Sequence, residues 1–160
     1  MIRIATKEDI PFLYRLHMHP SVNPWLLYEH MTFEEFLPIG TDLVHRGIKW
    51  LYEVDGKPVG MCKLQPMKYR NSHIAYLGGV AIDPEWCGKG HGKMMIDAAI
   101  GQTRSSGFTR MELTVATTNT RAIRLYESLG FMSEGILLNY TYLTSEKRYV
   151  DEQVMGLIFS

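Results

Sequence analysis

The stretch Val80–Lys93, with the sequence VAIDPEWCGKGHGK, decides how this chain is interpreted. An apolar run ends at Ile82, a loop with three glycines at alternate positions follows, and a helix is then predicted. Glycines spaced in this way let backbone N–H groups face one direction, and the free amides of a helix N-terminus add to them. This pattern predicts a site for an anion, above all a phosphate or pyrophosphate. The alternative is a strand-to-helix turn that needs glycine only for its shape.

The loop fits neither of the two commonest phosphate-binding patterns. A Walker loop requires Gly-Lys followed by Ser or Thr, whereas Gly90 follows Lys89. The dinucleotide fingerprint Gly-x-Gly-x-x-Gly requires two residues before its third glycine, whereas only His91 separates Gly90 from Gly92. The predicted anion site is therefore of another kind.

Outward from this loop, hydrophobic periodicity predicts the element order β-α-α-β-β-β-α-β-α-β-β. The predicted strands cover 2–4, 48–54, 57–64, 73–82, 111–115, 131–138 and 153–159, the last two joined by a polar loop at 145–148. The predicted helices lie at 6–19, 32–47, 93–107 and 118–129, the last three ending at or beside glycine. Hairpins beside crossovers make the expected sheet a mixed one.

Turn and capping residues refine this outline. Thr32-x-x-Glu35 is a capping box, and Pro38 with Gly40 predicts a kink or a split in the helix that it opens. Asp55-Gly56 predicts a tight hairpin turn. Gly78-Gly79 inside the run 73–82 predicts a bulge or a close backbone approach.

Composition limits the classes of protein that remain. The chain has 160 residues, of which 46% are hydrophobic, and its 17 Lys and Arg balance 17 Asp and Glu. We expect one domain over residues 1–160, no nucleic-acid partner because positive charge does not dominate, and no membrane partner because no apolar run is long enough. The N-terminus is too charged for a signal peptide, and two cysteines make no disulfide framework. These features predict a cytoplasmic protein.

A second motif makes the pattern specific. Asn119 lies seven residues before Tyr126, in a predicted helix that ends at Gly130-Phe131. Together with the glycine loop, this segment resembles the GCN5-related N-acetyltransferase (GNAT) superfamily. The later stretch from Glu134-Gly135 through Tyr149-Val150-Asp151-Glu152 to Met155 resembles the branch that acetylates free amino acids, related small amines and protein N-termini. The resemblance implies an α/β (mixed α+β) fold. Its central twisted sheet has about seven strands, is mostly antiparallel and splayed in the middle, and is flanked by about four helices.

The resemblance also implies acetyl-CoA as co-substrate and no metal. It assigns cofactor binding to backbone and side-chain groups of Val80, Ala81, Ile82, Cys87, Gly88, Lys89, Gly90, His91, Gly92, Lys93, Asn119 and Ala122. Tyr126 matches the general acid that protonates the departing thiolate, and its alternative role is that of a core aromatic. Asn119 has the alternative role of a helix cap. Cys87 departs from the family, which usually has Gln or Arg there, so a passive small side chain or a reactive thiol are both open.

The acceptor side of the site is less specific. Trp25, Tyr28 and Glu29 lie between the first two predicted helices, where family members bind the acceptor, and the alternative is that the aromatics pack beneath the helices. Tyr76 occupies a position where many relatives carry an acidic base, and a neutral phenol is a poor base. The remaining candidates for the general base are Glu29, His30, Glu35 and His73.

Three functions follow. The first is acetyl transfer from acetyl-CoA to the primary amine of a small molecule such as an amino acid, by direct attack on the thioester. The second is the same chemistry on a protein N-terminus or lysine. The third, from another class, is an acyl-CoA-binding sensor without turnover. The resemblance further implies a homodimer formed through the last strands.

Overall fold

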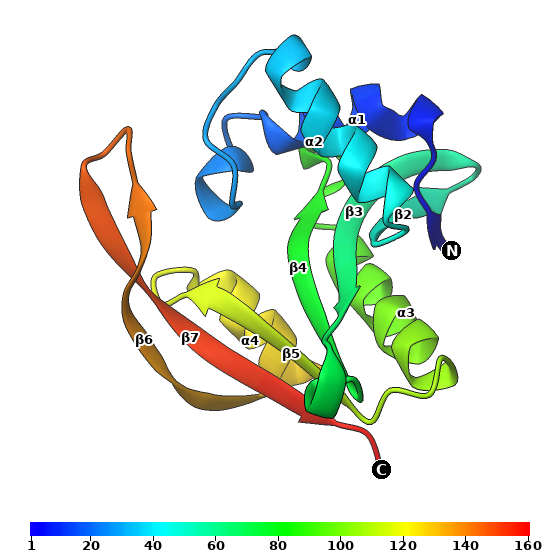
Figure 1. The fold of residues 1–160 in the computed structure, drawn as a ribbon, viewed down its shortest axis with the longest axis vertical. Helices are drawn as coiled ribbons and strands as arrows, with labels where there is room; N and C mark the ends of the chain where they lie inside the picture. The colour runs from blue at the N-terminus through cyan, green and yellow to red at the C-terminus, as the bar shows by residue number, and fades with distance from the viewer. The chain divides into compact units, whose positions relative to one another are not determined.

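The structure is a computed structural model that describes all residues 1–160 (Figure 1). It contains seven strands in the order β1-β2-β3-β4-β5-β7-β6, and four α-helices. The strands are β1 (Ile2–Ile4), β2 (Lys49–Val54), β3 (Lys57–Pro66), β4 (Ile74–Ile82), β5 (Arg110–Ala116), β6 (Met132–Leu143) and β7 (Arg148–Ile158). The helices are α1 (Ile10–His17), α2 (Phe33–His45), α3 (His91–Ser105) and α4 (Thr120–Ser128). The expected mixed α/β architecture is confirmed, and no helix is long and apolar enough to cross a membrane.

The chain divides into two compact units. The first comprises Met1–Gln65 with Gly78–Ala99, and the second comprises Pro66–Leu77 with Ile100–Ser160. Strand β4 contributes its first residues to the second unit and its last residues to the first.

The first unit is built on β1, β2, β3 and the end of β4. β1 and β3 both pair antiparallel with β2, and the hairpin turn between β2 and β3 is formed by Asp55 and Gly56, both with positive φ. Leu51 and Met61, which are opposite each other in the register, pack with α1 and α2 in one apolar core. Gly40 allows the two helices to approach, because a Cβ there would lie 3.1 Å from Ile10 Cγ2.

The second unit is built on the start of β4 and on β5, β7 and β6. Ile74–Tyr76 pairs in parallel with Arg110–Glu112, and this ladder stops before Leu77. β7 pairs antiparallel with both β5 and β6. On the helix side, the ring of Tyr126 in α4 packs edge-on against Phe131 at a centroid distance of 5.7 Å.

Three expectations about local structure are wrong in whole or in part. α2 is not split, because Pro38 lies on its exposed side and leaves only the solvent-exposed turn at Glu34 without a helical hydrogen bond; the alternative, a kink at Pro38, stays a prediction. The last two strands are longer than expected: β6 continues past Leu138 to Leu143 and β7 begins at Arg148 and not at Gln153, while the turn between them stays close to the predicted loop. α3 begins at His91, two residues earlier than expected.

The buried carboxylate of one residue stabilises the N-terminal segment by accepting several hydrogen bonds. Asp9 accepts hydrogen bonds from Arg3 Nη1 at 2.7 Å and Nη2 at 3.0 Å, and from the backbone N–H of Thr6 at 2.7 Å. The hydrogen bond from Arg3, together with that from Thr6, holds the pKa of Asp9 below its ordinary value of 3.8. Because the folded-state pKa is depressed, this stabilisation is present above pH 3.8 and is lost as the pH falls through the lower folded-state pKa.

We expect Asp9→Asn to lower the free energy of unfolding by about 1–2 kcal/mol at pH 7, since Arg3 is partly exposed. The difference from wild type should shrink below about pH 4, as the wild-type carboxylate is protonated. Urea denaturation at several pH values measures both effects. Asp42→Asn, which removes an exposed ion pair with Arg46 at 3.4 Å, is the matched control and should change stability by about 0.5 kcal/mol or less. A pH-independent difference would contradict the assignment.

Candidate functional site

The loop that follows β4 is anchored by Asp83. Its buried carboxylate lies 2.8 Å from Arg15 Nη2 and accepts the backbone N–H of Glu85 at 3.2 Å. Its own N–H donates to the carbonyl of Val59 in β3 at 2.8 Å. A short 3₁₀ helix, Pro84–Trp86, follows at once, with proline at its first position. The chain therefore leaves the sheet at a fixed point and direction.

Two glycines give the loop its backbone conformation. φ is +78° at Gly88 and +84° at Gly90, in the left-handed region that favours glycine. A Cβ at either position would meet nothing within 4 Å, so glycine is required by the backbone and not by crowding. Residues 87–90 are exposed. Left-handed glycine conformations are therefore present at the first two glycines of the loop, and its role in anion binding stays a prediction.

The helix N-terminus lies directly after these glycines. The amide of Met94 donates to the carbonyl of Gly90 at 3.1 Å, which makes it the first helical hydrogen bond of α3. The amides of His91, Gly92 and Lys93 precede it and have no helical acceptor. Gly92 is thus a helical residue, and the expectation that it belongs to the loop is wrong. Its N–H group nevertheless stays among those that can bind an anion.

Side chains around the loop hold its shape and add charge. The ring of His91 contacts Trp86 at a centroid distance of 5.4 Å and Tyr52 at 5.9 Å. The Lys89 ammonium lies 5.5 Å from the centre of the Trp86 ring, a cation–π contact. Lys93 is exposed on the first turn of α3. The two lysines give this exposed segment a positive character.

Cys87 acts as a small side chain. It is exposed, its backbone is extended, and its thiol donates to the carbonyl of Ile82 with a sulfur-to-oxygen distance of 3.7 Å. This contact favours the passive role over a reactive one, and the long polar side chain that the resemblance would place here is absent.

Strand β4 is distorted just before the loop. φ at Gly79 is +53°, and a Cβ at this residue would lie 3.0 Å from the ammonium nitrogen of Lys49 in β2. The expectation of a close backbone approach here is therefore confirmed. Of the next residues, Val80 and Ile82 are half-buried and Ala81 is buried.

The segment predicted to bind the acceptor is divided between core and surface. Tyr28 packs on His17 and Phe36 at centroid distances of 5.3 and 6.4 Å, and burial raises the pKa of its phenol. Trp25 is 52% exposed, and Glu29 is also exposed. Part of the segment thus packs against the helices, as the alternative interpretation holds, while Trp25 remains available to a ligand.

The helix α4 in the second unit carries the second motif. Asn119 caps it, since Oδ1 accepts the N–H of Ala122 at 3.3 Å. Ala122 is half-buried, whereas Tyr126 is only 6% exposed and contacts Phe131. The structure therefore bears out the capping and packing roles of these residues and leaves their roles toward acetyl-CoA as predictions.

The second unit also brings together polar groups that sequence reasoning did not combine. The hydroxyl of Tyr76 lies 3.1 Å from Thr114 Oγ1, and burial raises the pKa of the Tyr76 phenol. The negative charge of Glu152 in β7 also acts on this phenol. Glu152 is half-buried and accepts the hydroxyl of Thr141 at 2.8 Å. A carboxylate thus lies in the neighbourhood of Tyr76, contributed by another strand.

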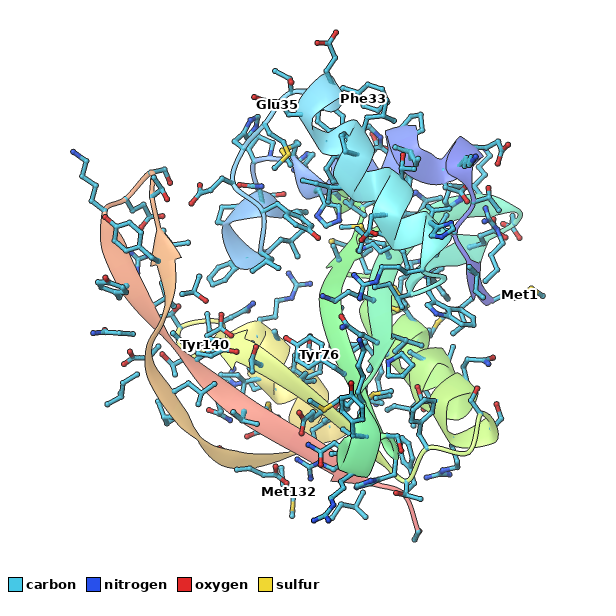
Figure 2. The ribbon with its side chains drawn as sticks, in the orientation of Figure 1. Met1, Phe33, Glu35, Tyr76, Met132 and Tyr140 are labelled. Carbon is cyan, nitrogen blue, oxygen red and sulfur yellow. The ribbon has the colours of Figure 1, made fainter.

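Of the four residues that the sequence offers as the general base, one caps a helix and three are exposed. Glu35 forms the capping box of α2: its carboxylate accepts the N–H of Thr32 at 2.8 Å (Figure 2). Glu29, His30 and His73 are exposed. No group of three or more His, Cys, Asp or Glu side chains is arranged to hold a metal ion. Glu152 could have been found only through the pairing of β7 with β5, which places it opposite Ala116.

Comparisons with known proteins agree with this arrangement. The family model described as "Acetyltransferase (GNAT) family" matches residues 10–131. The [Ribosomal protein bS18]-alanine N-acetyltransferase of Escherichia coli (strain K12) is 36% identical over 95% of this chain and 93% of that protein. Its counterpart from Salmonella typhimurium is 36% identical over 54% of this chain and 57% of that protein. The crystal structure of spermidine N-acetyltransferase from Vibrio cholerae, in complex with CoA and spermine, has a TM-score of 0.85 at 22% identity, over 99% of this chain and 94% of that chain.

We expect Gly90→Ala to weaken acetyl-CoA binding by about tenfold, because a Cβ disfavours the left-handed backbone by roughly 1–2 kcal/mol. Isothermal titration calorimetry with acetyl-CoA measures the change. Gly101→Ala is the matched control: it lies within α3, has an ordinary helical φ, and its Cβ would meet nothing within 4 Å. That variant should bind as wild type does, and equal affinity for all three proteins would contradict the role of the loop.

Proposed function

Because the chain belongs to the GNAT acetyltransferase family, we propose that it acetylates the primary amine of a small molecule such as an amino acid. The donor is acetyl-CoA. The observation that carries the proposal is the exposed loop with left-handed Gly88 and Gly90, which leads directly into the N-terminus of α3. Such a loop offers consecutive amides to a pyrophosphate.

Different residues of the chain suit different parts of acetyl-CoA. Amides of residues 88–93 and the ammonium groups of Lys89 and Lys93 suit the pyrophosphate. The backbone of Val80–Ile82 suits an extended pantetheine arm, which pairs with it as a strand would. Asn119 and Ala122 are assigned to the same arm by the family resemblance. When bound, acetyl-CoA supplies the thioester, whose carbonyl carbon is the atom that the acceptor amine would attack.

Three groups are proposed to move or stabilise charge. Glu152 accepts a proton from the incoming ammonium, directly or through water, so that a neutral amine attacks. The backbone N–H near Val80 stabilises negative charge on the carbonyl oxygen. Tyr126 donates its phenolic proton to the departing thiolate. Tyr76, a neutral phenol hydrogen-bonded to Thr114, orients the acceptor and is not the base.

A second candidate acceptor is a protein N-terminus. It is favoured by the 36% identity to a protein named as an N-acetyltransferase of an alanine in a ribosomal protein. An acyl-CoA sensor without turnover is the third. A thiol-release assay separates them, with acetyl-CoA and three acceptor pools: amino acids, polyamines, and peptides with different N-terminal residues. Turnover with the first pool alone supports the proposal, turnover with peptides alone supports the second candidate, and CoA binding without turnover supports the sensor.

We also propose that residues 1–160 function as one acetyltransferase domain in the cytoplasm and form a homodimer. Strand β6 supports the dimer, since its exposed apolar side chains include Leu138 and also Met132 and Tyr140, which Figure 2 labels. Edge strands of this kind pair readily with a second copy. A monomeric mass in light scattering would contradict it.

Tyr126→Phe keeps the ring and its contact with Phe131 while it removes the proton donor. We expect kcat to fall by about 10²-fold, the low end of general acid catalysis, because water partly substitutes for the phenol. Acetyl-CoA affinity should stay within about threefold, since the ring remains. Steady-state kinetics and calorimetry measure the two quantities. Wild-type turnover in a folded variant would exclude the role, and a large loss of stability would identify Tyr126 as a core residue only.

Glu152→Gln removes the carboxylate charge and keeps the side-chain shape. We expect kcat/KM to fall by about 10²-fold or more at pH 7, with a smaller deficit at high pH, where the amine is already neutral. A pH–rate profile from pH 6 to 10 tests this. Glu146→Gln is the control on the same hairpin, because Glu146 is exposed and pairs only with Arg148 at its turn. Equal pH profiles for wild type and the Glu152 variant would exclude Glu152 as the base.

A further inference from the structure

Two basic side chains are buried in the first unit without a counter-charge. Lys49, the first residue of β2, is 1% exposed and forms no ion pair. His17, the last residue of α1, is 2% exposed, and neither Nδ1 nor Nε2 has a hydrogen-bond partner. Buried polar groups are normally paired, because an unpaired one loses the hydrogen bonds it made to water. The ring nitrogens of His17 therefore lack a partner, and the buried ammonium of Lys49 lacks a counter-charge.

The two groups share one face of the first unit. Lys49 is two residues before Leu51, and Lys63 is two residues after Met61, so both lysines point to the sheet face that packs against α1 and α2. Lys49 and Lys63 are directly opposite in the register. The charges of both lysines act on His17, which places the imidazole near them. Three basic groups thus converge at the edge of the apolar core.

The charged groups that act on Lys49 and His17 include no carboxylate. Burial, with the charge of Lys63, lowers the pKa of Lys49 to about 7, and the only group that raises it is the thiol of Cys62. Burial, with both lysine charges, lowers the pKa of His17 to about 2, so the imidazole is neutral and offers one N–H donor. On α2, Asp42 pairs with Arg46 at 3.4 Å. An anion is the missing partner.

The cluster lies beside the strand segment assigned to the donor. The Lys49 ammonium is 3.0 Å from the position of a Cβ at Gly79, the residue before Val80. A carboxylate held by Lys49 is therefore next to the backbone that the proposed function assigns to the pantetheine arm. The polycation spermidine would be repelled by the same lysines.

We propose that His17 and Lys49 bind the carboxylate of the acceptor, which makes the acceptor a free amino acid or a closely related amino carboxylate. This inference rests on the proposed function. Lys49 forms the ion pair, His17 donates its N–H to a carboxylate oxygen, and Lys63 adds positive charge. A peptide N-terminus, whose α-carboxylate has become an amide, lacks the anion.

The kinetic test compares each amino acid with its α-carboxamide, which keeps the amine and side chain and removes the charge. We expect wild type to prefer the acid by about tenfold or more in kcat/KM, the scale of a charged hydrogen bond. Lys49→Met should abolish that preference by lowering kcat/KM for the acid only. Lys57→Met, at an exposed lysine at the start of β3, should change neither substrate. Equal rates with acid and amide in wild type, or an equal loss of both in Lys49→Met, would overturn the proposal.

A binding test does not depend on turnover. The pKa of Lys49 is followed by NMR in wild-type protein carrying ¹³C-labelled lysine, with Lys49→Met used to assign its signal. Propionate should raise that pKa by about one unit or more, whereas propionamide should not. An unchanged pKa would overturn the carboxylate site even if acetyl transfer is demonstrated. A raised pKa together with no acetylation of any amine would support the carboxylate site and overturn the proposed function.

Discussion

The left-handed backbone of Gly79 is the constraint on which the functional part of this protein depends. Its φ of +53° interrupts β4, and the Lys49 ammonium occupies the space where a side chain would begin. A residue with a Cβ would both strain the backbone and displace the lysine. Beyond this point the strand continues through Val80–Ile82 to Asp83, whose ion pair with Arg15 anchors the glycine loop. The strand segment proposed for the pantetheine arm, the loop proposed for the pyrophosphate and the proposed carboxylate site therefore all lie close to one backbone distortion.

The first unit contains buried ionisable groups of two kinds, one paired with an opposite charge and the other not. At the start of the chain, Asp9 is matched to Arg3 and to the Thr6 amide, so a buried charge is fully paired. Elsewhere in the same unit, His17 is buried without a hydrogen-bond partner and Lys49, near Gly79, is buried without an ion pair. A chain with no net charge thus contains a local excess of positive charge in its interior. Unpaired buried groups cost stability, and a ligand that pairs them recovers it.

Membership of the family predicts the donor, acetyl-CoA, but does not identify the acceptor amine. The fold is shared with proteins named for a ribosomal protein alanine and for spermidine, two chemically different amines. A shared fold does not specify the acceptor, because specificity lies in local groups. The groups that we propose for this role are Tyr76 and Glu152 in the second unit and His17 and Lys49 in the first. The absence of a long polar side chain at Cys87 is compatible with donor binding, since the loop amides do not depend on it.

Much of this could be predicted from the sequence because it depends on neighbouring residues. Glycine at 88 and 90, the Asp55-Gly56 turn and the Thr32–Glu35 capping box each act through a few adjacent dihedral angles and hydrogen bonds, and periodicity identified all seven strands. The exposed position of Pro38, which leaves α2 intact, and the full length of the β6–β7 hairpin depend on packing and pairing. Local sequence patterns therefore allowed a split in α2 that is absent, and they predicted β6 and β7 to be shorter than they are.

The sequence by itself determined the order of the elements, the glycine loop before α3 and the resemblance to one family, since each depends on local spacing. Only the tertiary structure decided that Lys49 is buried. A lysine in a predicted strand is expected to face water, and its burial depends on α1 and α2 covering that face of the sheet. It likewise decided that Glu152 lies in the neighbourhood of Tyr76, because strand register brings together residues far apart in the chain. Charged residues acquire such roles from the groups packed around them, and that environment is set by the fold.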